Sequence, residues 1–173
     1  MNKTFKEVYG ADSQRFAGGG HALAFVKYLR LAQYTENKIF KLYSRWRLMR
    51  LHEKYGLEIS WRVKIGKGFY IGHAYGITIN DNAILGENIN IHKGVTIGQE
   101  NRGDRQGAPV IGNKVWIGVN ATIVGKITIG NDVLIAPNSY VNCDVPDHSV
   151  VFGNPCIIKH KDNATEGYIN NVV

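Results

Sequence analysis

The chain has 173 residues, 44% of them hydrophobic and 20% charged, which is enough apolar material for one folded domain. This composition excludes a disordered polymer, and 4 prolines beside 20 glycines exclude a collagen-like repeat. Residues 21–56 hold eight basic and two acidic side chains, so this segment carries +6 of the net charge of +7. No apolar run approaches the ~20 residues of a membrane span, and the first residues lack the apolar core of a signal peptide. We therefore expect a cytoplasmic protein.

Residues 1–57 are predicted to form an N-terminal segment with two basic amphipathic helices. Residues 1–20 show no sustained period, and glycines 18–20 are predicted to be a hinge. From His21 to Tyr55 the apolar spacing is helical, with a break predicted at Thr35 and a stop at Gly56. The apolar stripe expected to face the core contains Val26, Leu29, Ile39, Leu42, Tyr43, Trp46 and Met49.

After residue 63 the period changes to six. Aliphatic or small residues recur at positions 65, 71, 77, 83, 89 and 95, and again at 111, 117, 123, 129, 135 and 141. A six-residue period fits neither a helix nor a long strand and is typical of a parallel β-helix, in which three hexads close one triangular coil. Twelve hexads predict about four coils over residues 58–160, followed by a C-terminal tail at 161–173.

The series is interrupted by a polar loop at residues 99–109. From Val95 to Ile111 there are sixteen residues, ten more than one hexad. Because a loop that leaves a regular solenoid usually has a function, we expect this one to take part in a site.

The hexads, the segment Gly72-His73-Ala74-Tyr75-Gly76-Ile77, the Gly103-Asp104-Arg105 loop and the closing Gly153-Asn154-Pro155 together resemble the hexapeptide-repeat acyltransferases. Among these, the chain is most similar to serine acetyltransferase and its short relatives in polysaccharide gene sets. The resemblance covers roughly residues 58–160. It implies a left-handed parallel β-helix, a homotrimer, and acetyl-CoA lying in the groove between neighbouring β-helices.

The resemblance also implies a set of catalytic residues. His73 stands at the position of the family's general base, and Glu58 stands where the family places the carboxylate that orients it. A base is needed because the acceptor hydroxyl must lose its proton as it attacks the thioester, and the pKa of histidine lies near working pH. His92 follows His73 by nineteen residues, one coil plus one position, so we do not expect the two to stack.

Other side chains are assigned to the substrates. Arg105 and His92 are the candidate acceptor contacts. We assign binding of acetyl-CoA to small or polar residues near the later coils and to a lysine that meets a phosphate: Gly118, Ala136, Asn154, Pro155 and Lys159. Acetyl-CoA is expected as a co-substrate, and no metal is expected.

Two departures from the family bear on the acceptor. Serine acetyltransferases have aspartate directly before the base, where this chain has Gly72, and histidine in an Asp-Arg-His-Pro loop, where this chain has Gln106 or Ala108. The sequence therefore predicts an acetyl-CoA-dependent O-acetyltransferase that acts on a sugar hydroxyl in polysaccharide synthesis, with serine O-acetyltransferase as the alternative.

Two other classes remain open. A zinc carbonic anhydrase-like trimer needs three converging histidines, whereas only His73 and His92 lie within the regular coils. A non-catalytic β-helix scaffold would not bind acetyl-CoA. The basic helices are interpreted as a trimer-packing cap, with attraction to an anionic membrane or a lipid-linked sugar as an alternative. Because no nucleic-acid-binding motif is present, no nucleic acid is expected.

Overall fold

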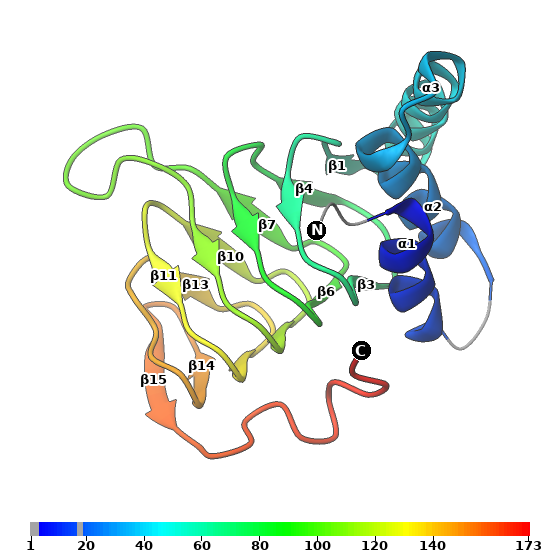
Figure 1. Cartoon of the computed structure of the whole chain (residues 1–173). Helices are drawn as coiled ribbons and strands as arrows, with labels where there is room; N and C mark the ends of the chain where they lie inside the picture. Colours follow the sequence, from blue (N-terminus) through cyan, green and yellow to red (C-terminus); the bar gives the residue numbers. More distant parts are fainter. Residues whose placement is uncertain (1–3, 17–18) are drawn as a thin grey trace.

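The computed structural model describes residues 4–16 and 19–173. In this part of the chain, three helices pack at one end of a solenoid of short strands (Figure 1). The strands form three sheets, each on one side of the solenoid, and their order confirms the predicted parallel β-helix with an N-terminal helical cap. Gly18 of the predicted hinge lies outside the described residues.

The three sheets, here named A, B and C, are parallel except at the final strand. Sheet A contains β1 (Leu57–Ile59), β4 (Ile77–Ile79), β7 (Thr96–Gly98), β10 (Thr122–Val124) and β13 (Tyr140–Val141). Sheet B contains β2 (Lys64–Ile65), β5 (Ile84–Leu85), β8 (Val110–Ile111) and β11 (Thr128–Ile129). Sheet C contains β3 (Tyr70–Gly72), β6 (Asn90–His92), β9 (Val115–Ile117), β12 (Val133–Ile135), β14 (Ser149–Phe152) and the antiparallel β15 (Ile157–His160).

The interior of the solenoid is the predicted core. All twelve residues of the sixfold series are buried. The five strands of sheet A give about five turns within the described residues, not the four expected. The prediction missed one turn because strand β1 lies before the first residue of the sixfold series and still pairs with β4.

The register of the first coil differs from the sixfold series. Ile71 lies opposite Ile91 and Ile65 opposite Leu85, so this coil has 20 residues instead of eighteen. The two additional residues lie in the corner between β3 and β4. The change of register also alters the length of the loop. The last stacked residue before the loop is Ile97, which lies opposite Ile123, and the next is Ile111 in sheet B. The loop therefore adds eight residues to a hexad, not ten.

The cap differs from the prediction at its start. Helix α1 (Phe5–Gln14) was not predicted. Its two buried residues are one apolar and one charged, Val8 and Asp12, so the segment shows no apolar period. Its start is a capping box, in which the Thr4 hydroxyl accepts from the Glu7 amide and the Glu7 carboxylate accepts from the Thr4 amide. This Thr-x-x-Glu pattern is the signal that could have predicted the helix.

The predicted helical region contains α2 (His21–Tyr34) and α3 (Lys38–Tyr55). Thr35 ends α2, whereas Asn37 caps α3 by accepting from two backbone amides. Gly56 ends α3 in the left-handed conformation, as expected.

The stripe expected to face the core does so only in α2. Val26 and Leu29 are buried, but Ile39, Leu42, Tyr43, Trp46 and Met49 are between 46% and 79% exposed. Helix α3 instead buries the opposite face, which includes Ser44 and Leu48. The prediction was wrong for α3 because this helix has apolar residues on both faces, and spacing alone does not tell which face is covered.

The C-terminal tail runs back along the outside of the solenoid from β15 toward the cap (Figure 1). It bonds to different coils: the Thr165 hydroxyl donates to Asp132, and the side-chain amide of Asn90 donates to the Tyr168 carbonyl. The tail therefore covers part of the outer face of sheet C.

Candidate functional site

His73 opens the corner between β3 of sheet C and β4 of sheet A. This corner has four residues, 73–76, whereas the corresponding corner of the next coil has two, 93–94. The His73 backbone is in the left-handed region with φ of 51°, and its side chain is exposed. The two additional residues therefore move this histidine outward from the regular solenoid.

The cap holds this corner in place through His21, which the sequence analysis did not assign to the site. The Nε2 atom of His21 lies 3.1 Å from the carbonyl oxygen of Ala74. Its ring stacks on Tyr55 at 4.2 Å between ring centroids and contacts Tyr75 at 4.9 Å. The available signal was its position as the first residue of α2, directly after the glycines.

His92 lies beside the His73 corner but is not in register with His73, as predicted. In the ladder between β3 and β6, His92 is opposite Gly72, and the His73 and His92 ring centroids are 6.5 Å apart. The prediction assumed an eighteen-residue coil and placed His92 one position beyond a full coil, whereas the two additional corner residues place it one position short of one.

The His92 ring also explains the glycine at position 72. A Cβ atom at this position would lie 2.5 Å from Cε1 and Nδ1 of His92, a distance that real Cβ contacts do not show. An aspartate here, as in serine acetyltransferases, is therefore incompatible with the His92 ring in this position. Gly72 and His92 therefore form a pair: the His92 ring occupies the space that a side chain at position 72 would need.

The His92 ring packs against an aromatic side chain of the next coil. Its centroid lies 4.8 Å from that of Trp116, which in turn contacts Tyr168 of the tail at 5.0 Å. The Nε2 atom of His92 is buried and has no hydrogen-bond partner among the described residues. Burial, and then the neighbouring His73, lower the pKa of His92, so its ring is neutral at neutral pH.

The residues assigned to acetyl-CoA continue down the same corner. Because Ile91, Ile117 and Ile135 stack in successive coils, the residues that follow them, His92, Gly118 and Ala136, form a column along one edge of sheet C. Gly118 is buried, and a Cβ atom there would lie 2.6 Å from the Pro137 nitrogen. The stacking of the coils alone therefore requires glycine at position 118.

The last assigned residues lie at the far end of the solenoid. Asn154 and Pro155 are exposed in the turn between β14 and β15, and Lys159 is exposed on β15. The Lys159 Nζ atom lies 5.7 Å from the ring centroid of Phe152. A lysine in this position is accessible to an anionic group.

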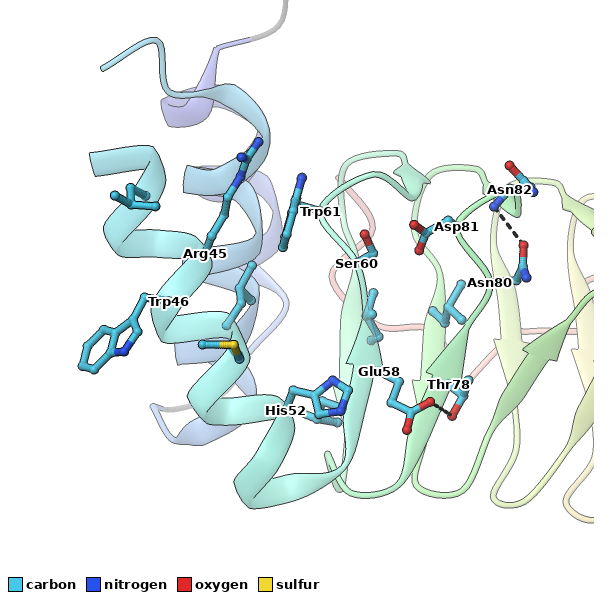
Figure 2. Close-up of a pocket in the computed structure, with 16 residues that line it drawn as sticks. Arg45, Trp46, His52, Glu58, Ser60, Trp61, Thr78, Asn80, Asp81 and Asn82 are labelled. Atoms are coloured by element: carbon cyan, nitrogen blue, oxygen red, sulfur yellow. Dashed lines mark hydrogen bonds between the residues drawn. The ribbon is translucent and has the colours of Figure 1, made fainter. Parts of the chain in front are cut away.

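Glu58 is not bonded to His73. It lies on the outer face of β1, where its Oε2 atom accepts a hydrogen bond from the Thr78 hydroxyl at 3.3 Å (Figure 2). It lines a groove of about 800 Å³ between α3 and sheet A, together with His52, Trp61 and Asn80. His73 does not line this groove, so the structure does not place the predicted base and its orienting acid in contact.

Arg105 lies in the loop that leaves the corner between sheets A and B, whereas His73 lies at the corner between sheets C and A. The width of sheet A, a three-residue strand of about 10 Å, separates these corners. The loop projects from the solenoid (Figure 1) and is anchored at its base, where the Arg105 carbonyl accepts from the Lys126 amide. Within one chain, Arg105 and His73 do not meet.

The described residues contain neither a cluster of metal ligands nor a membrane-spanning helix. Across residues 4–16 and 19–173, no three histidine, cysteine, aspartate or glutamate side chains are grouped as metal ligands would be. Over the same residues, no helix is both long enough and apolar enough to span a bilayer.

The sequence and structure match known proteins. Residues 108–143 match the family model described as bacterial transferase hexapeptide (six repeats). The chain is 37% identical over 139 residues to serine acetyltransferase 2 of Arabidopsis thaliana, covering 79% of this chain and 42% of that protein. It is 35% identical over 107 residues to the Helicobacter pylori serine acetyltransferase, covering 62% of this chain and 63% of that protein. The chain thus spans less than two thirds of these relatives.

Solved structures agree with these matches. Soybean serine acetyltransferase without ligand superposes with a TM-score of 0.75 at 27% identity, covering 90% of this chain and 69% of that one. The Neisseria gonorrhoeae enzyme in complex with serine superposes with a TM-score of 0.73 at 28% identity, covering the same shares. The solenoid described above fits the left-handed β-helix of these hexapeptide-repeat neighbours.

Proposed function

We propose that this chain, a hexapeptide-repeat protein similar to the serine acetyltransferases, transfers the acetyl group of acetyl-CoA to the hydroxyl of a small acceptor. The observation that carries the proposal is the exposed His73 at the head of the column formed by His92, Gly118 and Ala136. A base at one end of a column with small residues is the arrangement expected for a long thioester substrate that lies along the solenoid.

In the proposed reaction, the His73 imidazole takes the proton of the acceptor hydroxyl as its oxygen attacks the thioester carbonyl. The new C–O bond forms, the C–S bond breaks, and the imidazolium returns the proton to the leaving thiolate of CoA. A positioned base of this kind contributes about 10²–10⁴ in rate. No covalent enzyme intermediate is required, so both substrates bind together.

The proposed site is completed between subunits of a homotrimer. This arrangement is supported by the distance between corners, because Arg105 cannot meet His73 of its own chain but lies on a projecting loop. Glu58 is the proposed orienting acid for His73 and would exchange its bond with Thr78 for one with the imidazole.

L-serine is the acceptor that the relatives support. The similar proteins are serine acetyltransferases, and one of the matched structures is a complex with serine. Serine supplies both a hydroxyl for acetylation and charged groups that a site can bind.

A sugar hydroxyl is a second candidate, favoured by one observation. The Gly72–His92 pair places a neutral ring where serine acetyltransferases have a carboxylate beside the base. An ammonium group binds more strongly to a carboxylate than to a neutral imidazole, so the pair favours an acceptor without a positive charge.

The test is release of free CoA from acetyl-CoA with L-serine or with a panel of nucleotide sugars as acceptor. Turnover with one acceptor, and its loss in His73→Asn, supports the proposal. Asparagine tolerates the left-handed backbone of position 73, so this variant tests the imidazole and not the fold. Absence of acetyl-CoA binding by calorimetry would instead identify a non-catalytic scaffold.

A further inference from the structure

Helix α3 presents an apolar surface to solvent that nothing in the described part of the chain covers. Its members, here named the α3 stripe, are Ile39, Leu42, Tyr43, Trp46 and Met49. They are spaced by three or four residues and therefore lie on one face of the helix. The opposite face packs on the rest of the protein through Ser44 and Leu48. Large exposed apolar patches mark interaction sites in soluble proteins.

The α3 stripe is exposed both on the outside of the cap and at the rim of the groove beside sheet A. Figure 2 shows Trp46 directed away from sheet A, whereas Arg45 lies beside Trp61, with its guanidinium 4.5 Å from the ring centroid. Ile39 is 79% exposed and Leu42 is 71% exposed. Leu42, Trp46 and Met49 also line the groove between α3 and sheet A, so the apolar surface extends from the helix into this hollow.

Basic residues flank the α3 stripe on both sides. At 100° per residue, one flank holds Lys38 and Arg45, the other holds Arg47 and Lys54, and Arg50 lies within the stripe. Glu53 is the sole acidic residue of α3 in the sequence, and it pairs with Arg50 at 2.9 Å. The exposed flanking lysines Lys38 and Lys54 have no ion-pair partner among residues 4–16 and 19–173. The exposed face of α3 is therefore apolar along its centre line and positively charged along both sides.

We propose that α3 binds the surface of an anionic lipid bilayer, with the α3 stripe in the headgroup region and the flanking basic residues on lipid phosphates. Tryptophan and tyrosine suit this boundary because each has an apolar body and a polar atom, and lysines extend their charge to the headgroups. Helices with an apolar face and a Lys/Arg-rich polar surface bind membranes in this way without spanning them.

Charge disfavours a second copy of the same stripe as the partner. Two α3 helices facing each other would bring their basic flanks together, and like charges repel in a contact from which water is excluded. An anionic bilayer satisfies both the apolar and the charged parts. This inference does not depend on the proposed acetyl transfer.

The test is co-sedimentation of the full chain with vesicles of phosphatidylcholine alone and with vesicles that also contain phosphatidylglycerol. We expect binding to the anionic vesicles only, and weaker binding as salt is raised. Lys38→Gln with Lys54→Gln should weaken binding by about tenfold or more, since each basic residue near the surface contributes on the order of 1 kcal/mol. Lys114→Gln with Lys126→Gln is the matched control on the solenoid and should leave binding unchanged.

The apolar part is tested in the same assay by Ile39→Ser with Trp46→Ser. These exposed residues can be changed without opening the core, and we expect vesicle binding to be lost. Ile84→Ser with Val110→Ser, two exposed apolar residues on sheet B, is the matched control. Unchanged solution mass of the stripe variant by light scattering supports the proposal. A lower mass would identify the stripe as a contact between copies and overturn it, as would absence of binding to anionic vesicles by the wild type.

Discussion

Two polar clusters lie on the first coil of the solenoid, and they differ in whether their buried polar atoms have partners. On the cap side, Arg30 is fully buried and donates to Asp12 at 2.7 Å and to the carbonyl oxygens of Ile65 and Gly66. Asp12 also accepts from the Phe69 amide. This cluster, here named the cap cluster, joins α1, α2 and the first coil.

The second cluster, at the His73 corner, is incompletely satisfied. His92 has a buried Nε2 atom without a partner in the described residues, and His73 is exposed in a left-handed conformation. Satisfied buried polar groups stabilise a structure, whereas unsatisfied or strained ones concentrate at functional sites. Under the proposed function, the cap cluster serves stability and the corner serves chemistry, and each of the following changes tests this division.

The largest expected effect is on turnover in His73→Asn. We expect the rate of acetyl transfer to fall by about 10²–10⁴ because the hydroxyl loses its base. The free energy of unfolding should change by less than about 0.5 kcal/mol, because the side chain is exposed and asparagine accepts the backbone conformation. Urea unfolding and a CoA-release assay measure the two quantities. Near-normal turnover would remove His73 from the mechanism, and His160→Asn, at another exposed histidine, is the control.

The cap cluster should show the opposite pattern. Asp12→Ala leaves the Arg30 guanidinium buried without its carboxylate, so we expect a loss of about 3–5 kcal/mol in the free energy of unfolding. Arg62→Ala is the control, because its 3.5 Å pair with Asp81 is exposed and such pairs contribute about 0–1 kcal/mol. Denaturant unfolding of both variants measures the difference. Similar small losses in the two variants would contradict a structural role for the buried pair.

The solenoid and its core could be predicted from the sequence because each hexad contributes a buried aliphatic residue at a fixed spacing. The register could not, since the two additional residues at 73–76 do not interrupt the apolar series: Ile77 is as buried as Ile71. His92 was therefore expected one position beyond a full coil from His73, whereas it lies one position short of one. His73 and the column of Gly118 and Ala136 were predicted for one site and lie along one edge.

Tertiary contacts decided the features that the sequence did not show. Helix α3 has apolar residues on both faces, so only packing distinguishes buried Leu48 from exposed Trp46. Glu58 was assigned from a resemblance, and its observed bond is with Thr78, which becomes its neighbour only when the coil closes.

The Gly72–His92 pair allows a smaller, coupled test. Gly72→Asp alone forces a side chain into the His92 ring, and overpacking of this kind costs about 1–3 kcal/mol. Adding His92→Ala makes room for the carboxylate, so the double variant should recover part of the stability lost by Gly72→Asp. If L-serine is the acceptor, the double variant should also show a lower KM for it, because a carboxylate then lies beside His73. Additive losses of stability would show that the two positions do not compete for space.

The smallest expected effects are opposite pKa shifts at two histidines. Burial and the neighbouring His73 lower the pKa of His92, so the folded state loses stability as pH falls below the ordinary value near 6.5. A hydrogen bond to Asp132, together with nearby carboxylates, raises the pKa of His148, so its stabilisation is present at low pH and is lost as pH rises through the raised value. Imidazole proton resonances followed by NMR should titrate below the ordinary pH for His92 and above it for His148. In His73→Asn, the charge of the neighbouring imidazole no longer acts on His92. The pKa of His92 should then rise toward the ordinary value, while the pKa of His148 stays fixed. An unchanged His92 titration in this variant would mean that the two rings do not interact, and the corner would then lose its distinction from the cap cluster.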